Sequence, residues 1–314
     1  MKKIIILSIL LLIAFSIIFT GCKMPEMEKK GPIIVSSKID TEGALLGNII
    51  IIMLREYDYV VIDKLEFGPT NVVREAIKNK EIDIYPEYTG NGNYFFDGTK
   101  KTLWKDAKKA YKKVKEMDFE KNKLVWLNPA EANNTWGIAI RKNIADEYDV
   151  STLSDLADYI NKGNDFKIAC SEEFVNRPDA LPAFKNTYNF DLKKNQKLVL
   201  SGGNTAQTEK AAYEKTNGVN AAMAYGTDGQ LSAFNLVLLE DDKNVQPVYQ
   251  PAPVIRNEII KEYPKIKKIL NPVFDSLTQK KLQELNSKIA VEGRSPVVVA
   301  RTYLKENNFL KKDE

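Results

Sequence analysis

The chain has 314 residues, and its 46 lysines and arginines nearly balance its 42 aspartates and glutamates, leaving a formal net charge of +4. This balance does not predict the strongly basic surface that binds nucleic acid. The absence of histidine and the presence of only two cysteines exclude Ser-His-Asp and Cys-His catalysis and the commonest zinc sites. The composition therefore favours a binding role over an enzymatic one, with no metal and no cofactor.

The N-terminal segment predicts export. Two lysines precede an apolar run from Ile4 to Phe19, which is shorter than the roughly 20 residues of a membrane span. Small residues then lead into Cys22. A basic start, a short apolar core and small residues before a cleavage site are typical of a secretory signal, and the cysteine looks like the end of a lipobox. We expect residues 1–21 to be a signal peptide, with an uncleaved anchor helix as the alternative.

The residues after the signal are polar and few. Residues 22–31 predict a tether between a lipid on Cys22 and the folded part. With Cys22 modified, Cys170 has no cysteine partner, so we expect a buried thiol and no disulfide framework. The mature chain should lie outside the cytoplasm, anchored to the cell membrane by lipid on Cys22. The rest is long enough for two domains.

Strands and helices alternate along this part, which predicts α/β layers with largely parallel sheets. The expected strands are 32–37, 57–67, 81–85, 136–140, 166–170, 220–225 and 236–239. The expected helices are 41–55, 71–78, 102–117, 154–160, 180–188 and 205–213. Past residue 251 the chain is expected to be mostly helical, without a domain of its own, and to return to pack on the first domain.

Six segments, in order, resemble the osmoprotectant-binding subunits of ABC importers (the ProX, OpuBC and OsmF group), and the OsmF-like branch most of all. They are 36–42, 81–90, 133–136, 171–182, 224–229 and 247–253, and they span nearly the whole mature chain. The most specific are Tyr-Pro-Glu-Tyr-Thr-Gly, ending at Gly90, and Tyr-Gly-Thr-Asp-Gly, ending at Gly229.

The resemblance implies a two-lobed fold like that of periplasmic binding proteins of type II, each lobe a sheet flanked by helices, with a hinge between them. Lobe one would hold residues 32–133 and 250–314, and lobe two residues 134–249. The implied function is the extracytoplasmic subunit of an ABC importer that captures a quaternary ammonium osmoprotectant, with glycine betaine first. Its partners would be this small molecule and the membrane permease subunits. We expect a monomer that is not an enzyme and binds no nucleic acid.

A quaternary ammonium group has no N–H to donate, and its charge, spread over methyl groups, suits the negative faces of aromatic rings. By the resemblance, four rings form this aromatic cage: Tyr88, Trp136, Tyr225 and Tyr249. Trp136 departs from the usual tyrosine but keeps the chemistry, because tryptophan offers the strongest cation–π face.

The carboxylate of a betaine needs donors. By the resemblance Arg177 binds it, since a guanidinium can fork onto two oxygens. Lys38 supplies a point charge before a helix N-terminus, whose amides also favour anions. Further polar contacts are expected from Thr89, Asn91 and Asn134. Asn91 and Asn134 stand where relatives often carry Thr and Asp.

Other functions remain open on the sequence alone. The ligand could instead be choline, carnitine or another solute. A sensory or structural lipoprotein without a transport role is a second alternative. The third is an extracytoplasmic hydrolase, for which Glu87, Glu172 and Glu173 are the candidate carboxylates beside the motifs.

Overall fold

The computed structural model describes residues 30–201, 204–231 and 233–310. The predicted signal peptide, Cys22 and most of the predicted tether lie outside these residues. One compact unit begins at Gly31 and contains the two sheets that the described residues form. In the part of the chain that is described, no helix has the length and apolar character needed to cross a membrane.

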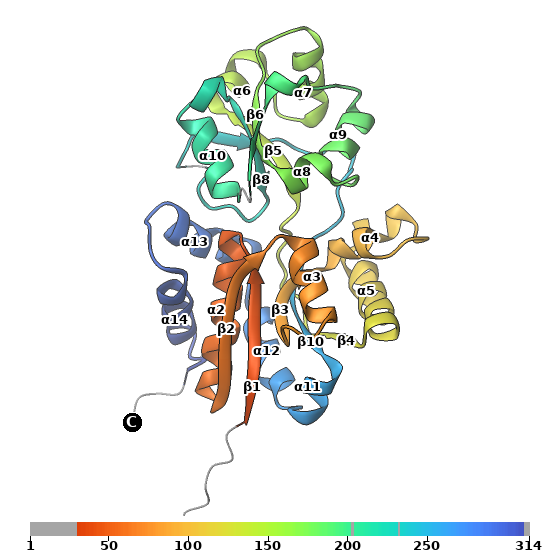
Figure 1. Cartoon of the computed structure of the whole chain (residues 1–314). Helices are drawn as coiled ribbons and strands as arrows, with labels where there is room; N and C mark the ends of the chain where they lie inside the picture. The colour runs from red at the N-terminus through yellow and green to blue at the C-terminus, as the bar shows by residue number, and fades with distance from the viewer. Residues whose placement is uncertain (1–29, 202–203, 232, 311–314) are drawn as a thin grey trace, which may run out of the picture. The chain divides into compact units, whose positions relative to one another are not determined.

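The first sheet has five strands in the order β2-β1-β3-β10-β4 (Figure 1). They are β1 (Lys30–Lys38), β2 (Tyr59–Gly68), β3 (Ile84–Tyr88), β4 (Leu124–Trp126) and β10 (Pro251–Arg256). Its helices are α2 (Thr41–Glu56), α3 (Thr70–Lys78), α4 (Gly92–Phe95), α5 (Ala107–Asn122), α11 (Asn257–Glu262), α12 (Ile266–Asp275), α13 (Gln279–Ala290) and α14 (Pro296–Glu306). This part of the protein is called half one below.

The second sheet also has five strands, in the order β7-β6-β8-β5-β9. They are β5 (Trp136–Arg141), β6 (Ile168–Ser171), β7 (Lys197–Leu200), β8 (Ala221–Tyr225) and β9 (Leu236–Leu238). Its helices are α6 (Lys142–Tyr148), α7 (Leu153–Asn161), α8 (Glu172–Asn176), α9 (Leu181–Tyr188) and α10 (Thr205–Tyr213). This part is called half two, and it confirms, with half one, the predicted α/β class.

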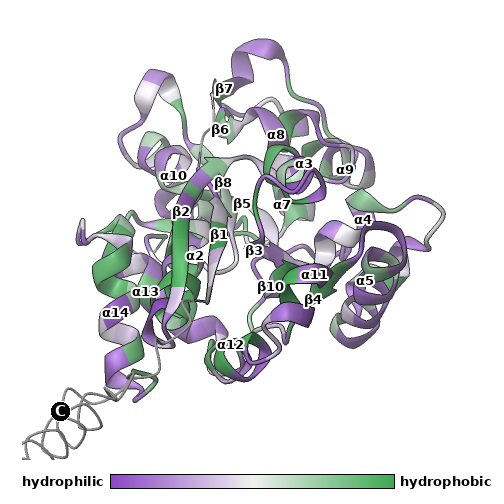
Figure 2. Ribbon diagram, turned by 60° about the horizontal axis from the view of Figure 1, so that its bottom comes forward, coloured by the Kyte–Doolittle hydropathy of each residue, from purple (hydrophilic) through white to green (hydrophobic). Residues whose placement is uncertain are grey.

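Alternating side chains along the strands give each sheet two apolar faces. In β1, Ile33 and Val35 join the core that α2 and α11–α14 cover, while Ile34 packs into the core on the other side, under α3 and α5. In β5, Ile138 points into one core and Ala139 into the other. A period of two in a strand buried on both faces produces this pattern. Figure 2 shows the consequence, with apolar colour on the inner strands and α2 and polar colour on the outside of α5.

Helix α2 is held between the first sheet and the C-terminal helices. Asp40 caps its N-terminus, accepting a hydrogen bond from the Gly43 backbone N–H at 2.7 Å. Residues 49–54 of this helix are all buried, because α12, α13 and α14 pack against it (Figure 1). The first turn of α2 is thereby fixed at the end of the sheet where β1 stops.

The sheets are mixed, not largely parallel as the alternation predicted. β1 runs parallel to β3, and β6 parallel to β7 and β8, but β10 is antiparallel to β3 and β5 is antiparallel to β8. The chain passes between the halves at residues 127–135 and 239–250. β5 and β10 follow these connections, so each starts at the edge where its neighbours end.

Three other expectations need correction. The expected helix 102–117 is a 3₁₀ turn, Lys101–Lys105, followed by α5, which Asp106 caps through the Lys109 N–H at 3.0 Å. Strand β3 begins at Ile84, later than expected. The strand β10 was missed because Pro251 and Pro253 argue against a strand, yet their carbonyls accept from Ala130 and Leu127 at 2.8 and 2.9 Å.

Candidate ligand-binding site

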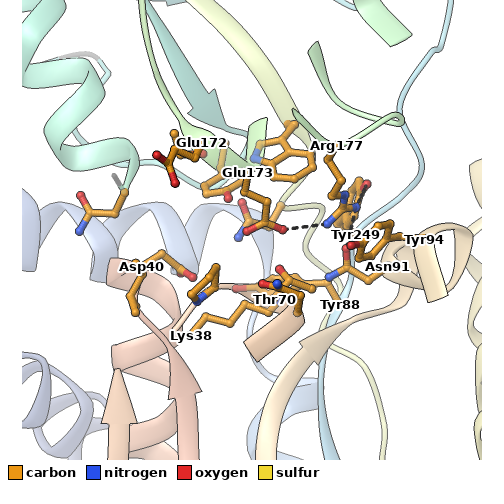
Figure 3. A pocket seen from close by; sticks show the side chains of 18 of the residues that line it. Lys38, Asp40, Thr70, Tyr88, Asn91, Tyr94, Glu172, Glu173, Arg177 and Tyr249 are labelled. Atoms are coloured by element: carbon orange, nitrogen blue, oxygen red, sulfur yellow. Dashed lines mark hydrogen bonds and ion pairs between the residues drawn. The ribbon is translucent and has the colours of Figure 1, made fainter. Parts of the chain in front are cut away.

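A cavity of about 380 Å³ lies between the halves, at the edge where β1, β3, β6 and β8 end (Figure 3). Ligands of open α/β sheets bind at this carboxyl edge. Of the nine residues predicted to contact ligand, all but Thr89 line it. These eight residues are Lys38, Tyr88, Asn91, Asn134, Trp136, Arg177, Tyr225 and Tyr249.

Three aromatic rings meet around Trp136. The ring centres of Trp136 and Tyr225 are 6.0 Å apart with planes 16° from parallel, because the two residues are cross-strand partners in β5 and β8. Tyr249 lies 6.2 Å from Trp136 at 58°. It is placed by the two connecting segments, where the Asn134 N–H donates to the Tyr249 carbonyl at 2.9 Å. Tyr88, at the end of β3, brings a fourth ring from half one.

Arg177 is buried and already has several acceptors. Its Nε and Nη2 donate to the two carboxylate oxygens of Asp179, at 2.6 and 2.9 Å, and its Nη1 donates to Glu173 at 3.0 Å. Nη2 also reaches Asn91 Oδ1 at 2.9 Å and the Tyr249 hydroxyl at 3.3 Å. The forked edge of this guanidinium is therefore occupied by Asp179.

Lys38 and Asn91 share a buried carboxylate. Glu87 Oε1 accepts from Lys38 Nζ at 2.7 Å, from Asn91 Nδ2 at 2.6 Å and from the Tyr88 backbone N–H at 2.7 Å. Its other oxygen accepts from the Tyr85 hydroxyl at 2.9 Å. Asn91, with its amide nitrogen on Glu87 and its amide oxygen on Arg177, connects the two basic side chains of the cavity.

The rings of the cavity already face cations of the protein itself. Lys38 Nζ lies 4.7 Å from the centre of the Tyr88 ring, and the Arg177 guanidinium carbon lies 4.5 Å from the Trp136 ring. These distances are within the roughly 6 Å of a cation–π contact. The ring faces are thus oriented toward positions where a positive group is stabilised.

Thr89, which was predicted to contact the ligand, does not line the cavity. It is fully buried, and its hydroxyl donates to the Val248 carbonyl at 3.0 Å and accepts from the Gln250 N–H at 3.1 Å. Its side chain is therefore used to hold the segment that carries Tyr249, behind the cavity wall.

Several lining residues were missed or given another role. Tyr94 of α4 lies with its ring centre 4.4 Å from the Arg177 guanidinium carbon. Asp40, Glu172 and Glu173 also line the cavity, and burial raises the pKa of Asp40 against the opposing effects of the Gly43 N–H and Lys38. Asp40 and the glutamates stand within the motif segments, so inspecting every charged motif residue would have found them; Tyr94 carries no such signal.

The cavity wall combines rings with both signs of charge. Lys38 and Arg177 supply positive groups, while Asp40, Glu172 and Glu173 supply carboxylates. Such a wall can hold a small zwitterion whose cationic end prefers rings and whose anionic end prefers N–H donors. Among the described residues, no group of three or more His, Cys, Asp or Glu side chains is arranged to hold a metal ion.

Comparison with known proteins identifies the family. Residues 31–306 match the family model described as the substrate binding domain of an ABC-type glycine betaine transport system. The chain belongs to this family. The glycine betaine-binding protein YehZ of Escherichia coli K12 is 50% identical over 298 residues, covering 95% of this chain and 98% of that protein.

Solved structures of the family share the fold. Unliganded YehZ of Escherichia coli is 52% identical, covers 89% of this chain and 99% of its own, and superposes with a TM-score of 0.65. Lactococcal OpuAC in its closed conformation with glycine betaine is 15% identical, with coverage of 90% and 100% and a TM-score of 0.57, which supports the fold alone. Members of this family are solute-binding proteins of ABC transporters. They work outside the cytoplasm, together with permease subunits.

Proposed function

We propose that this chain captures glycine betaine, with its trimethylammonium group among the rings of Tyr88, Trp136, Tyr225 and Tyr249. The observation that carries the proposal is the convergence of these four rings, from both halves and a connection, on one cavity that two basic side chains also line. Each ring contact with a quaternary ammonium gives on the order of 0.5–2 kcal/mol. Four together give useful affinity without any hydrogen bond to the cation.

The carboxylate of the ligand binds to N–H groups that the protein leaves unused. Arg177 Nη1 carries two N–H groups, and among the described residues Glu173 is its one acceptor. Lys38 Nζ carries three, and Glu87 is its one acceptor within the same part of the chain. The ligand carboxylate therefore accepts one hydrogen bond from Arg177 and one or two from Lys38, in place of the bidentate contact expected from Arg177 alone. Asn91 and Asn134 add amide groups to the same wall.

The two halves serve as the lobes of a closing binding protein. Lobe one comprises residues 32–133 and 250–314, lobe two residues 134–249, and the hinge lies near residues 134 and 249. Ligand favours the closed form because Tyr88 of one lobe and Trp136 and Tyr225 of the other engage it together only then. The volume of about 380 Å³ falls within the roughly 300–1,000 Å³ of small-molecule sites.

The protein works as a monomer held at the outer face of the cell membrane by lipid on Cys22, where it delivers its ligand to the permease subunits. This part of the proposal is supported by the apolar run and the small residues before Cys22. Metabolic labelling with a fatty acid tests it: label should enter the wild type and Cys170→Ala but not Cys22→Ala. Label in Cys22→Ala would refute the anchor.

Calorimetric titration of the purified soluble domain tests the ligand. Glycine betaine should bind, and glycine, which carries the same carboxylate without the methyl groups, should not. Choline and carnitine in the same series decide whether another quaternary amine binds better. Mass spectrometry of the recovered ligand should find it unchanged, because a chemical change would indicate an enzyme. No binding of any quaternary amine at millimolar concentration would refute the proposal.

A further inference from the structure

Glu42, in the first turn of α2, is a buried carboxylate that no part of the proposed binding mode uses. It is 4% exposed and lies outside the cavity lining. Its Oε1 accepts from the Tyr88 hydroxyl at 3.0 Å and from Asn134 Nδ2 at 2.9 Å. Its Oε2 accepts from Asn286 Nδ2 at 2.9 Å. A buried carboxylate that has three side-chain donors and, among the described residues, no ion pair needs an explanation, because burying it is costly.

The three donors come from three parts of the protein. Tyr88 is a ring of the cavity, Asn134 lies in the first connection between the halves, and Asn286 belongs to α13. Asn286 also donates to the Thr227 carbonyl at 3.0 Å, in the turn that follows Tyr225 of half two. Glu42 thus stands where a ring of half one, a connecting segment and half two meet.

Asn286 is one of three amides on the same side of α13 that hold this turn. Gln279 Nε2 and Gln283 Nε2 both donate to the Gly226 carbonyl, at 2.6 and 3.0 Å. Spacings of four and three residues place the three side chains on one helix face. We call these three amides, with Gly226 and Thr227, the α13 seam. It joins half one to half two beside the cavity, directly after Tyr225.

The charge of Glu42 acts on the Tyr88 ring. A hydroxyl that donates to a carboxylate is polarised, and hydrogen-bonded groups polarise one another more strongly at low dielectric. Electron density moves into the ring, whose face then attracts a cation more strongly. The Tyr88 hydroxyl has this anionic acceptor, whereas the Tyr249 hydroxyl accepts from the Arg177 cation.

We propose that Glu42 is a positioning residue for ligand binding: it orients and polarises the Tyr88 ring and fixes the α13 seam through Asn286. This inference rests on the proposed function, because it assigns a residue to the same site. Glu42 acts through Tyr88, Asn134 and Asn286 and does not touch the ligand.

The surroundings of Glu42 make this role depend on pH. Burial raises its pKa to about 7, Asp40 adds to the rise, and the hydrogen bonds from Asn286 and Tyr88 oppose it. On the facing elements, β3 presents Tyr88 and α13 presents the uncharged Asn286; Lys38 is paired with Glu87, and Asp228 of half two has its own pKa raised by burial.

The surrounding amides can hydrogen-bond to Glu42 in either of its protonation states. The amide oxygens of Asn134 and Asn286 are buried and have no partner in the described part of the chain. Either amide can turn over and accept from a protonated Glu42, since the two ends of an amide have nearly the same shape. Only the ionised state polarises Tyr88, so affinity for a cation should rise as Glu42 loses its proton.

Titration of glycine betaine across pH tests the positioning role. Between about pH 6 and pH 8, wild-type affinity should rise by about fivefold, near the lower end of typical coupling between sites. Glu42→Gln keeps the shape without the charge, so its affinity should be lower at pH 8 and should rise less between pH 6 and pH 8 than that of the wild type. The matched control is Asp118→Asn, because Asp118 is a buried carboxylate that accepts from Arg74 and Trp126 away from the cavity. This variant should keep the wild-type profile. A Glu42→Gln variant with the wild-type profile would overturn the proposal.

Hydrogen exchange in the ligand-free protein tests the seam without relying on ligand. The Gly226 N–H donates to the Thr135 carbonyl at 3.0 Å, and the carbonyl of the same residue accepts from Gln279 and Gln283, so exchange of this N–H reports the opening of the turn that α13 holds. Glu42→Ala and Asn286→Ala should each speed this exchange by about tenfold, and Glu42→Gln less. Unchanged exchange in both alanine variants would overturn the proposal. If the wild type binds no quaternary amine, the proposed function fails, and this experiment still decides the role of Glu42.

Discussion

Arg177 Nη2 donates to Asn91 Oδ1 at 2.9 Å, so a guanidinium of half two is hydrogen-bonded to an amide of half one across the cavity. The other end of that amide donates to Glu87, which also accepts from Lys38. The two basic groups proposed for the ligand carboxylate are therefore held in one network. Asn91, expected from the sequence as a polar contact of the ligand, is its central member.

The role of Arg177 predicts a difference between ligands. Arg177→Ala should weaken glycine betaine by roughly 10- to 150-fold, the equivalent of about 1.5–3 kcal/mol for a charge-assisted hydrogen bond in a closed cavity. Choline, which has a hydroxyl in place of the carboxylate, should lose much less, because Glu173 and Asp179 are left without their cation and favour a positive ligand. Parallel calorimetric titrations of both ligands measure the two factors.

Arg256→Ala is the matched control for this variant. Arg256 is half-buried and, like Arg177, is paired with two carboxylates, Asp83 and Glu258, but it ends β10 at the far edge of the sheet from the cavity. Its loss should reduce stability and leave both affinities unchanged. Equal losses for betaine and choline in Arg177→Ala would rule out a carboxylate-binding role.

The packing of the turn after β8 against α13 predicts that Gly229 cannot carry a side chain in the arrangement that the structure describes. A Cβ at this position would lie 2.1 Å from the Gln283 carbonyl oxygen and 2.6 Å from the Ser287 nitrogen, both backbone atoms that cannot swing away. Gly229→Ala should separate α13 from the turn after β8, and should weaken betaine and choline by a similar factor, about tenfold or more. Small-angle scattering with saturating ligand should give a larger radius of gyration than for the wild type.

Glu284→Ala, an exposed change on α13, is the control and should keep wild-type scattering and affinity. A Gly229→Ala protein that closes and binds like the wild type would mean that the seam has no part in closure.

Stability should fall as the pH rises through the acidic and neutral range. Burial raises the pKa of Glu42 from 4.5 to about 7, and the pKa values of Asp228 and Glu209 are raised as well. The folded protein thus holds protons that the unfolded chain has released, so the free energy of unfolding decreases with pH. For Glu42 the loss between about pH 5 and pH 8 is on the order of 2–3 kcal/mol.

Urea unfolding at these two pH values checks the sign and the size. Glu42→Gln should lack this part of the pH dependence, while Glu120→Gln, on the exposed face of α5, should keep it. If the free energy of unfolding changes between pH 5 and pH 8 by the same amount in the wild type and in Glu42→Gln, Glu42 does not hold its proton in this range.

The sequence predicted the residues that motifs carry, but not the partners that folding brings to them. Tyr88 and Tyr225 stand in the two most specific motifs, and both line the cavity. The local sequence also predicts α2, since Asp40 caps a continuous apolar run. By contrast, the acceptors of Arg177 include Asn91, which is 86 residues away, and no periodicity indicates such a contact.

The failures have physical causes of the same kind. Thr89 was expected to add a polar contact to the ligand, but its hydroxyl is hydrogen-bonded to the backbone of residues 248 and 250, which only the fold brings near. Strand β10 forms despite its prolines because the neighbouring chain contacts their carbonyl groups: Pro251 and Pro253 accept from the N–H groups of Ala130 and Leu127. The side chains that donate to Glu42 within the described part of the chain are 46, 92 and 244 residues away from it in sequence.

The most direct test of the account is the titration of glycine betaine and choline against Trp136→Ala and Tyr225→Ala. Both ligands present the same trimethylammonium group, so each variant should lose about 3- to 30-fold in affinity for both, as expected from roughly 0.5–2 kcal/mol per ring. Tyr148→Ala, which removes a half-exposed ring of α6 far from the cavity, should bind both like the wild type. Wild-type affinity in the Trp136 and Tyr225 variants, with both proteins folded, would contradict the claim that these rings hold the cation.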